Sequence, residues 1–96
     1  MTANDMKNVL FNKLCDENCS FVKSDISIRK QNDNYKIIIK GYEHIPFKMT
    51  FEKDEYFGYI VYVYADEKCI IFVDELDYYD IKNALIQLGY YIGTRF

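Results

Sequence analysis

The chain has 96 residues, of which half are hydrophobic and 28% are charged. This composition is typical of a folded globular protein and excludes a disordered chain, and the length suits one modest core, so we expect a single domain over residues 1–96. No apolar run approaches the roughly 20 residues of a membrane span, and residues 1–7 do not resemble the start of a secretory signal. We therefore expect a cytoplasmic protein that does not enter a membrane, with its three cysteines reduced.

The net charge of −3 is unevenly distributed along the chain. Residues 1–53 hold nine Lys and Arg against seven Asp and Glu, whereas residues 54–96 hold three against eight. Phosphate backbones are bound by Lys and Arg, so a domain with an acidic half is poorly suited to bind nucleic acid directly.

The first 30 residues predict one helix and one strand. Apolar residues at helical spacing from Met6 to Leu14 indicate a helix that Thr2 or Asn4 caps and that ends between residues 16 and 18. From Phe21 to Lys30 the apolar period changes to two, with Val22 on the same face as the isoleucines that follow it. This pattern predicts a strand with one polar face.

Two further strands follow on either side of a loop over residues 41–46. The turn triplet at residues 32–34 leads into a strand over residues 35–40. Tyr35, Ile37 and Ile39 share its inner face, and Lys36, Ile38 and Lys40 share the outer one. A third strand begins at Phe47 and places Phe47, Met49 and Phe51 inward. Lys48, Thr50 and Glu52 then point outward.

The stretch from residue 56 to residue 73 predicts a β-hairpin. Both of its runs are rich in β-branched and aromatic residues, and a short polar turn of four residues, Ala-Asp-Glu-Lys at 65–68, separates them. Neither run alternates apolar with polar residues, so we expect both faces of the hairpin to be covered.

A second helix is predicted after residue 76. Asp77 is its expected N-cap, Leu85 and Leu88 belong to its buried stripe, and Gly89 is expected to end it as the C′ residue. Residues 90–96 are then expected to form a tail that adds a short edge strand.

Together these elements predict an α+β fold: an antiparallel meander of about five strands, with an N-terminal and a C-terminal helix packed on one face (α-β-β-β-β-β-α). Short connections favour pairing between sequential strands, and two helices suffice to cover one sheet face. The expected core residues are Val9, Leu14, Ile26, Ile37, Phe51, Val61, Ile71, Ile81 and Leu85.

No residue set has the spacing of a known catalytic, nucleotide or metal motif. Cys15, Cys19, Cys69 and His44 could in principle supply four zinc ligands, but the paired spacings of structural zinc sites are missing. A Cys69–His44 nucleophilic pair would lack an orienting third group. We therefore expect a protein that is not an enzyme and needs no metal or cofactor, with a small enzyme of unrecognised site as an alternative.

Acidic residues gather at one predicted end of the sheet. Turns of an up-and-down meander alternate between two ends, so Asp33 falls at the same end as the turn after the third strand and the corner before the second helix. Each acidic residue can also be explained as a turn former or a helix cap. Taken as a surface, the group predicts contact with a basic protein. The predicted partner-binding residues are Asp54, Glu55, Asp74, Glu75, Asp77, Tyr78, Tyr79 and Asp80.

Tyrosine is concentrated in the same acidic half of the chain. Tyrosine suits interfaces because it buries a large ring and keeps a polar tip. Two helices cannot cover both faces of the hairpin, so we expect a homodimer or higher oligomer. The residues predicted to make this oligomer or sheet-face contact are Tyr56, Ile60, Tyr62 and Tyr64.

In size and composition the chain resembles the small, acidic, tyrosine-rich, motif-free proteins of phages and mobile elements that inhibit host defence systems, anti-CRISPR proteins among them. That resemblance implies a non-catalytic inhibitor that occupies the basic nucleic-acid cleft of a host protein. An immunity or antitoxin-type partner of a basic toxin would use the same physical interactions and is the alternative.

Overall fold

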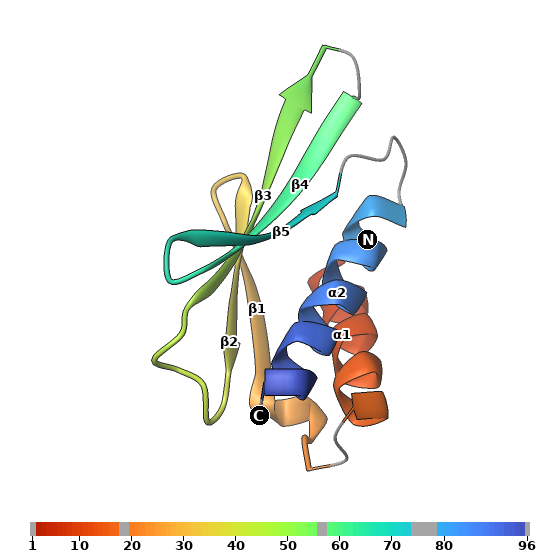
Figure 1. The fold of residues 1–96 in the computed structure, drawn as a ribbon, viewed down its shortest axis with the longest axis vertical. Coiled ribbons are helices and arrows are strands. Elements are labelled where there is room, and N and C mark those ends of the chain that lie inside the picture. The colour runs from red at the N-terminus through yellow and green to blue at the C-terminus, as the bar shows by residue number, and fades with distance from the viewer. Residues whose placement is uncertain (1, 18–19, 56–57, 74–78, 96) are drawn as a thin grey trace.

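The computed structural model describes residues 2–17, 20–55, 58–73 and 79–95, with the backbone alone at positions 53, 54, 58, 59, 79, 80 and 95. A helix, a five-stranded antiparallel sheet and a second helix follow one another along the chain (Figure 1). The strands pair in sequence order, as a meander. The elements are α1 (Ala3–Glu17), a short 3-10 helix η1 (Lys23–Asp25), β1 (Ile26–Gln31), β2 (Asn34–Ile39), β3 (Phe47–Asp54), β4 (Gly58–Ala65), β5 (Lys68–Val73) and α2 (Tyr79–Arg95).

Helix α1 begins at a reciprocal cap. The Asp5 N–H donates to the Thr2 hydroxyl oxygen at 3.1 Å, and the Thr2 N–H donates to the Asp5 carboxylate at 3.1 Å. This pairing satisfies two backbone donors that the first turn would otherwise leave free. Met6, Leu10 and Leu14 then lie fully buried along one stripe. Thr2 is thus the cap, and the predicted helix end near residue 17 is confirmed.

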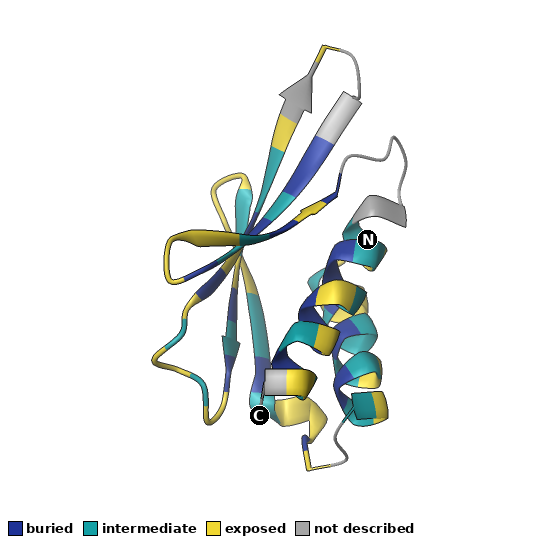
Figure 2. Cartoon of the chain, viewed as in Figure 1, coloured by how far each residue is buried: buried dark blue, intermediate teal, exposed yellow. Residues whose placement is uncertain are grey.

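Both helices pack on one face of the sheet, as predicted from the sequence (Figure 1). Helix α1 lies against β1, and α2 lies against β4, β5 and α1. Buried positions line the strands and the helix surfaces turned toward them (Figure 2). Six of the nine predicted core residues are buried, while Val9, Phe51 and Ile81 are half-buried and pack against the core. The side chains with no exposed surface include Met6, Leu10, Leu14, Ile37, Ile39, Met49, Val63, Ala84, Leu85, Leu88 and Ile92.

The β4–β5 hairpin turns more tightly than the sequence suggests. Asp66 and Glu67 form a two-residue loop with φ angles of 49° and 69°. Positive φ at both central residues matches the twist of the flanking strands, and Asp is among the residues that adopt it most readily. The strands therefore extend over Ala65 and Lys68, which were predicted to belong to a four-residue turn.

The predicted strand from Phe21 is wrong at its beginning. The Asp25 carboxylate accepts a hydrogen bond from the Val22 N–H at 3.0 Å, and the Asp25 N–H donates to the Val22 carbonyl. Because Asp25 bonds the backbone locally, residues 23–25 form η1, and β1 begins only at Ile26. Val22 is 54% exposed instead of inward-facing.

The end of α2 is also mispredicted. Gly89 does not end the helix, and residues 90–95 continue it instead of forming an edge strand. Ile92 explains the continuation, because it extends the buried stripe of Leu85 and Leu88 by one more turn. Asp77, the predicted N-cap, lies outside the described residues.

Gly89 and Gly93 allow α2 to lie close to α1. A Cβ atom at Gly89 would come within 2.7 Å of Lys13 Cγ and 2.8 Å of Lys13 Cβ. At Gly93 a Cβ atom would meet Glu17 Cβ. These two glycines, one helical turn apart, therefore set the distance between the helices.

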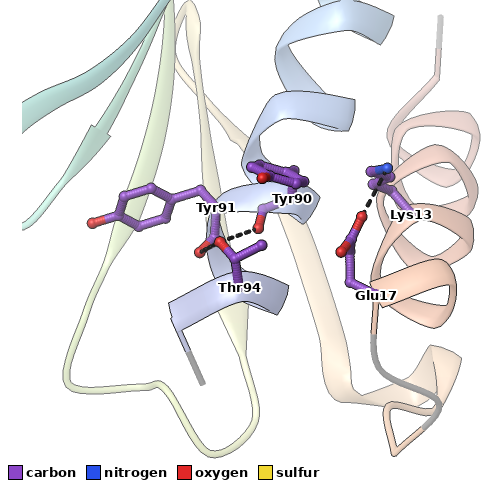
Figure 3. A network of polar contacts seen from close by, with 5 residues as sticks. All are labelled: Lys13, Glu17, Tyr90, Tyr91 and Thr94. Atoms are coloured by element: carbon purple, nitrogen blue, oxygen red, sulfur yellow. Dashed lines mark hydrogen bonds and ion pairs between the residues drawn. The ribbon is translucent and has the colours of Figure 1, made fainter.

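A polar network lines the outside of this helix pair (Figure 3). Lys13 Nζ lies 3.0 Å from the Glu17 carboxylate and 5.8 Å from the centre of the Tyr90 ring. The Thr94 hydroxyl donates to the Tyr90 carbonyl at 2.8 Å. Solvent-accessible pairs of this kind contribute about 0–1 kcal/mol, so close packing at the glycines matters more to the helix pair than its ion pair does.

Candidate interaction surface

The sheet face turned away from the helices, called here the outer face, is the main candidate surface. Strand side chains alternate between faces, so the residues between the buried core positions of β3 and β4 point outward. Neither helix lies on this side of the sheet (Figure 1). The outward residues of the three central rows are Lys48, Thr50 and Glu52 of β3, Ile60, Tyr62 and Tyr64 of β4, and Phe72 of β5.

An aromatic cluster of Tyr62, Tyr64 and Phe72 lies at the centre of the outer face. The ring centroid of Tyr62 lies 6.3 Å from that of Tyr64 and 5.5 Å from that of Phe72. Phe72, a large apolar side chain, is 53% exposed. Tyr62 and Tyr64, which the sequence predicted for sheet-face contact, thus lie together, and Phe72 is a member that sequence reasoning missed. Its outward direction follows from alternation with Ile71, which the sequence predicted for the core, but its place opposite Tyr62 depends on the strand register.

The outer face is already covered within one chain at Ile60 and at the Thr50 hydroxyl. Ile60, also predicted for this face, is only 9% exposed and lies outside the main core cluster. The Thr50 hydroxyl oxygen is buried and has no hydrogen-bond partner among the described residues. Tyr56, the fourth predicted contact residue, lies outside the described residues.

A row of cations crosses the outer face beside the aromatic cluster. Arg29 on β1 pairs with Lys36 on β2, and Lys36 pairs with Lys48 on β3. The Lys48 Nζ atom lies 5.2 Å from the centre of the Tyr64 ring, where a cation–π attraction partly offsets its repulsion from Lys36. The sequence predicted that Lys36 and Lys48 point outward, but only the strand register brings these charges into one row.

A hollow of about 300 Å³ lies at the end of the outer face, beside Lys36 and Lys48 of this row. Lys36, Lys48 and Tyr64 line one part of it, and Glu67 of the β4–β5 turn lines another. An acidic side chain beside the two lysines lowers the net positive charge that an incoming anion would encounter.

The predicted acidic end is described only in part. Asp54 ends β3, and the exposed Glu55 follows it, so these two residues form the tip of the β3–β4 hairpin, called here the hairpin tip. The hairpin continues five residues past its last β2 pair, Tyr35↔Met49, which corresponds to about 16 Å of strand. It therefore extends beyond the other strands (Figure 1).

The remaining predicted partner-binding residues contribute less to the described surface. Asp74, Glu75, Asp77 and Tyr78 lie outside the described residues. Tyr79 and Asp80 form the start of α2, where the backbone alone is described. Asp33 lies in the β1–β2 turn, next to the first residue of β2. The β3–β4 hairpin extends past this point, so Asp33 is set back from the hairpin tip. Among the described residues, the hairpin tip is thus the acidic feature that extends furthest from the fold.

The shifted pKa values have local structural causes. Hydrogen bonds from the Thr2 backbone N–H and the Thr2 hydroxyl lower the pKa of Asp5. Backbone N–H groups of Glu43 and Gly41 lower the pKa of Glu43, and the Glu17 carboxylate raises the pKa of Lys13. Asp5 and Glu43 are exposed at turns and caps, and Lys13 is half-buried on the surface of α1.

The cysteine and histidine residues are dispersed in the part of the chain that is described. Cys15 is half-buried on α1, Cys69 is exposed on β5, and His44 is exposed in the loop before β3. Cys19 lies outside the described residues. No group of three or more His, Cys, Asp or Glu side chains suited to hold a metal occurs over residues 2–17, 20–55, 58–73 and 79–95.

Neither described helix is long and apolar enough to cross a lipid bilayer. No protein-family model, curated protein or solved structure matches the chain. Any functional proposal therefore depends on the surface itself.

Proposed function

We propose that this chain is a small non-catalytic binding protein that inhibits a nucleic-acid-binding protein of a host cell, acting in the cytoplasm. In this proposal the hairpin tip enters a basic cleft and occupies the place of the phosphate backbone. The observation that supports it most is the projecting hairpin with Asp54 and Glu55 at its end.

The chemistry of such a cleft favours this geometry. Proteins that bind nucleic acid line their clefts with Lys and Arg, which neutralise phosphates. Carboxylates on a narrow projecting element can form charge-assisted hydrogen bonds with the same groups. A two-stranded hairpin is narrow enough to enter where a whole domain is excluded. Electrostatic complementarity then speeds association and favours the correct partner over others.

Residues predicted from the sequence would extend the contact. The residues between β5 and α2 include Asp74, Glu75, Asp77 and Tyr78. Helix α2 packs against β5, the strand that ends just before them. In the proposed complex these carboxylates form the charged rim, while tyrosine rings supply buried area and lower the dissociation rate.

Reversing the charge of the hairpin tip is expected to slow association with the partner. The partner is first captured from lysate and purified, and binding is then measured by stopped-flow or surface kinetics at low and high salt. We expect Glu55→Lys to lower the association rate roughly threefold or more at low salt, because steering depends on the charge at the contact.

Asp16→Lys is the matched control for this measurement. Asp16 is exposed in the last turn of α1 and undergoes the same change in charge, but it lies far along the chain from the hairpin tip. It should leave the rate close to that of the wild type. Equal slowing by both variants would indicate a response to net charge alone and would contradict the proposed contact.

A further inference from the structure

The outer face is ordered by charge along β3 and β4. Glu52 and Ile60 form the row nearest the hairpin tip, and Thr50, Tyr62 and Phe72 form the next. Lys48 and Tyr64 form the third row. The face therefore runs from an acidic row, through an aromatic row, to a basic row.

We propose that a second copy of this chain packs on the outer face, related by a two-fold axis that lies between the sheets and runs perpendicular to the strands. With the axis at the level of the Thr50–Tyr62–Phe72 row, Glu52 of each copy faces Lys48 of the other. The aromatic rows meet at the centre. This arrangement goes beyond the proposed function and does not depend on it.

Symmetry distinguishes this arrangement from the other face-to-face dimer. A two-fold axis parallel to the strands would keep each row at its own level and place Glu52 against Glu52 and Lys48 against Lys48. Like charges in contact across an interface are strongly unfavourable. The perpendicular axis reverses the order of the rows, so each acidic row meets a basic row. A contact with C2 symmetry uses the same surface of both copies, so each copy contributes one acidic row and one basic row to it.

The aromatic cluster supplies the apolar area for this contact. Phe72 is 53% exposed, and the rings of Tyr62 and Tyr64 stack beside it. Aromatic residues are enriched at the centres of interfaces, where their burial dominates affinity. Two sheets packed face to face lie about 10 Å apart, a distance that side chains of this size fill. The two hairpin tips then lie at opposite ends of the dimer, where each remains free to bind a partner.

The test is a charge exchange followed by light scattering and sedimentation across a dilution series. We expect a dimer for the wild type. Glu52→Lys and Lys48→Glu should each raise the dimer dissociation constant at least about tenfold, because the symmetry repeats each repulsive contact twice in the dimer. Both residues are exposed, so the variants should fold, which circular dichroism checks.

The decisive part of this test is to restore contacts between opposite charges. An equimolar mixture of the two single variants, and a double variant carrying both changes in one chain, should each recover a dissociation constant close to that of the wild type. Phe72→Ser should weaken the dimer at unchanged fold. The proposal is overturned if the wild type is a monomer at every concentration, if Glu52→Lys strengthens the dimer, if neither the mixture nor the double variant recovers it, or if Phe72→Ser has no effect.

Discussion

Replacing Leu85 with alanine is expected to lower the free energy of unfolding by about 2–5 kcal/mol, because it removes three buried carbon atoms and leaves a cavity. Leu85 has no exposed surface and lies where α2 faces the sheet. Domains of this size are stabilised by about 5–15 kcal/mol in total, so this single change should remove a large part of the stability.

Urea unfolding followed by circular dichroism measures this loss. Gln87→Ala is the control, because Gln87 is exposed on the same helix and its replacement should change the stability by less than about 0.5 kcal/mol. If Leu85→Ala cost no more than this control, Leu85 would not be part of the core and the placement of α2 would be wrong.

Gly89→Ala is expected to destabilise the protein even though alanine is the better helix former. Helix propensity alone favours the change by about 1 kcal/mol. The added methyl group would lie within 2.8 Å of both Lys13 Cβ and Lys13 Cγ, however, and Cβ is fixed by the α1 backbone. Overpacking of this kind costs about 1–3 kcal/mol, so we expect a net loss of about 1–2 kcal/mol.

Thermal or urea unfolding of Gly89→Ala, Gly93→Ala and Gln87→Ala separates packing from propensity. Both glycine variants should be less stable than the wild type, whereas the exposed control should not. A rise in stability for Gly89→Ala would show that propensity prevails and that the helices do not approach as closely as the structure indicates.

The strand order and the inward-facing residues could be predicted because they depend on local patterns. Period-two alternation assigned Ile37, Ile39, Phe47 and Met49 to the buried face, and all four are buried. Predictions failed where a single side chain or a distant contact decides the structure. Asp25 bonds to the Val22 backbone and delays β1, and close contact with α1 keeps Gly89 inside a helix. Neither effect follows from apolar spacing.

The candidate surface could be predicted only in outline. Outward-pointing Tyr62 and Tyr64 follow from alternation, which the structure confirms. The exposure of Phe72 and the row formed by Arg29, Lys36 and Lys48 depend on the register of neighbouring strands. Register is a non-local property, so the sequence predicted the direction of single charges without their order across the sheet. Contact of the acidic end with a basic protein surface stays a prediction.

Displacement of nucleic acid from the partner tests the proposed inhibitory function most directly. A fluorescently labelled oligonucleotide is bound to the purified partner, this protein is titrated in, and anisotropy is recorded. We predict that the oligonucleotide is released as the protein saturates the partner, and that Glu55→Lys requires a higher concentration for the same release. Oligonucleotide that stays fully bound at saturating protein would contradict the account.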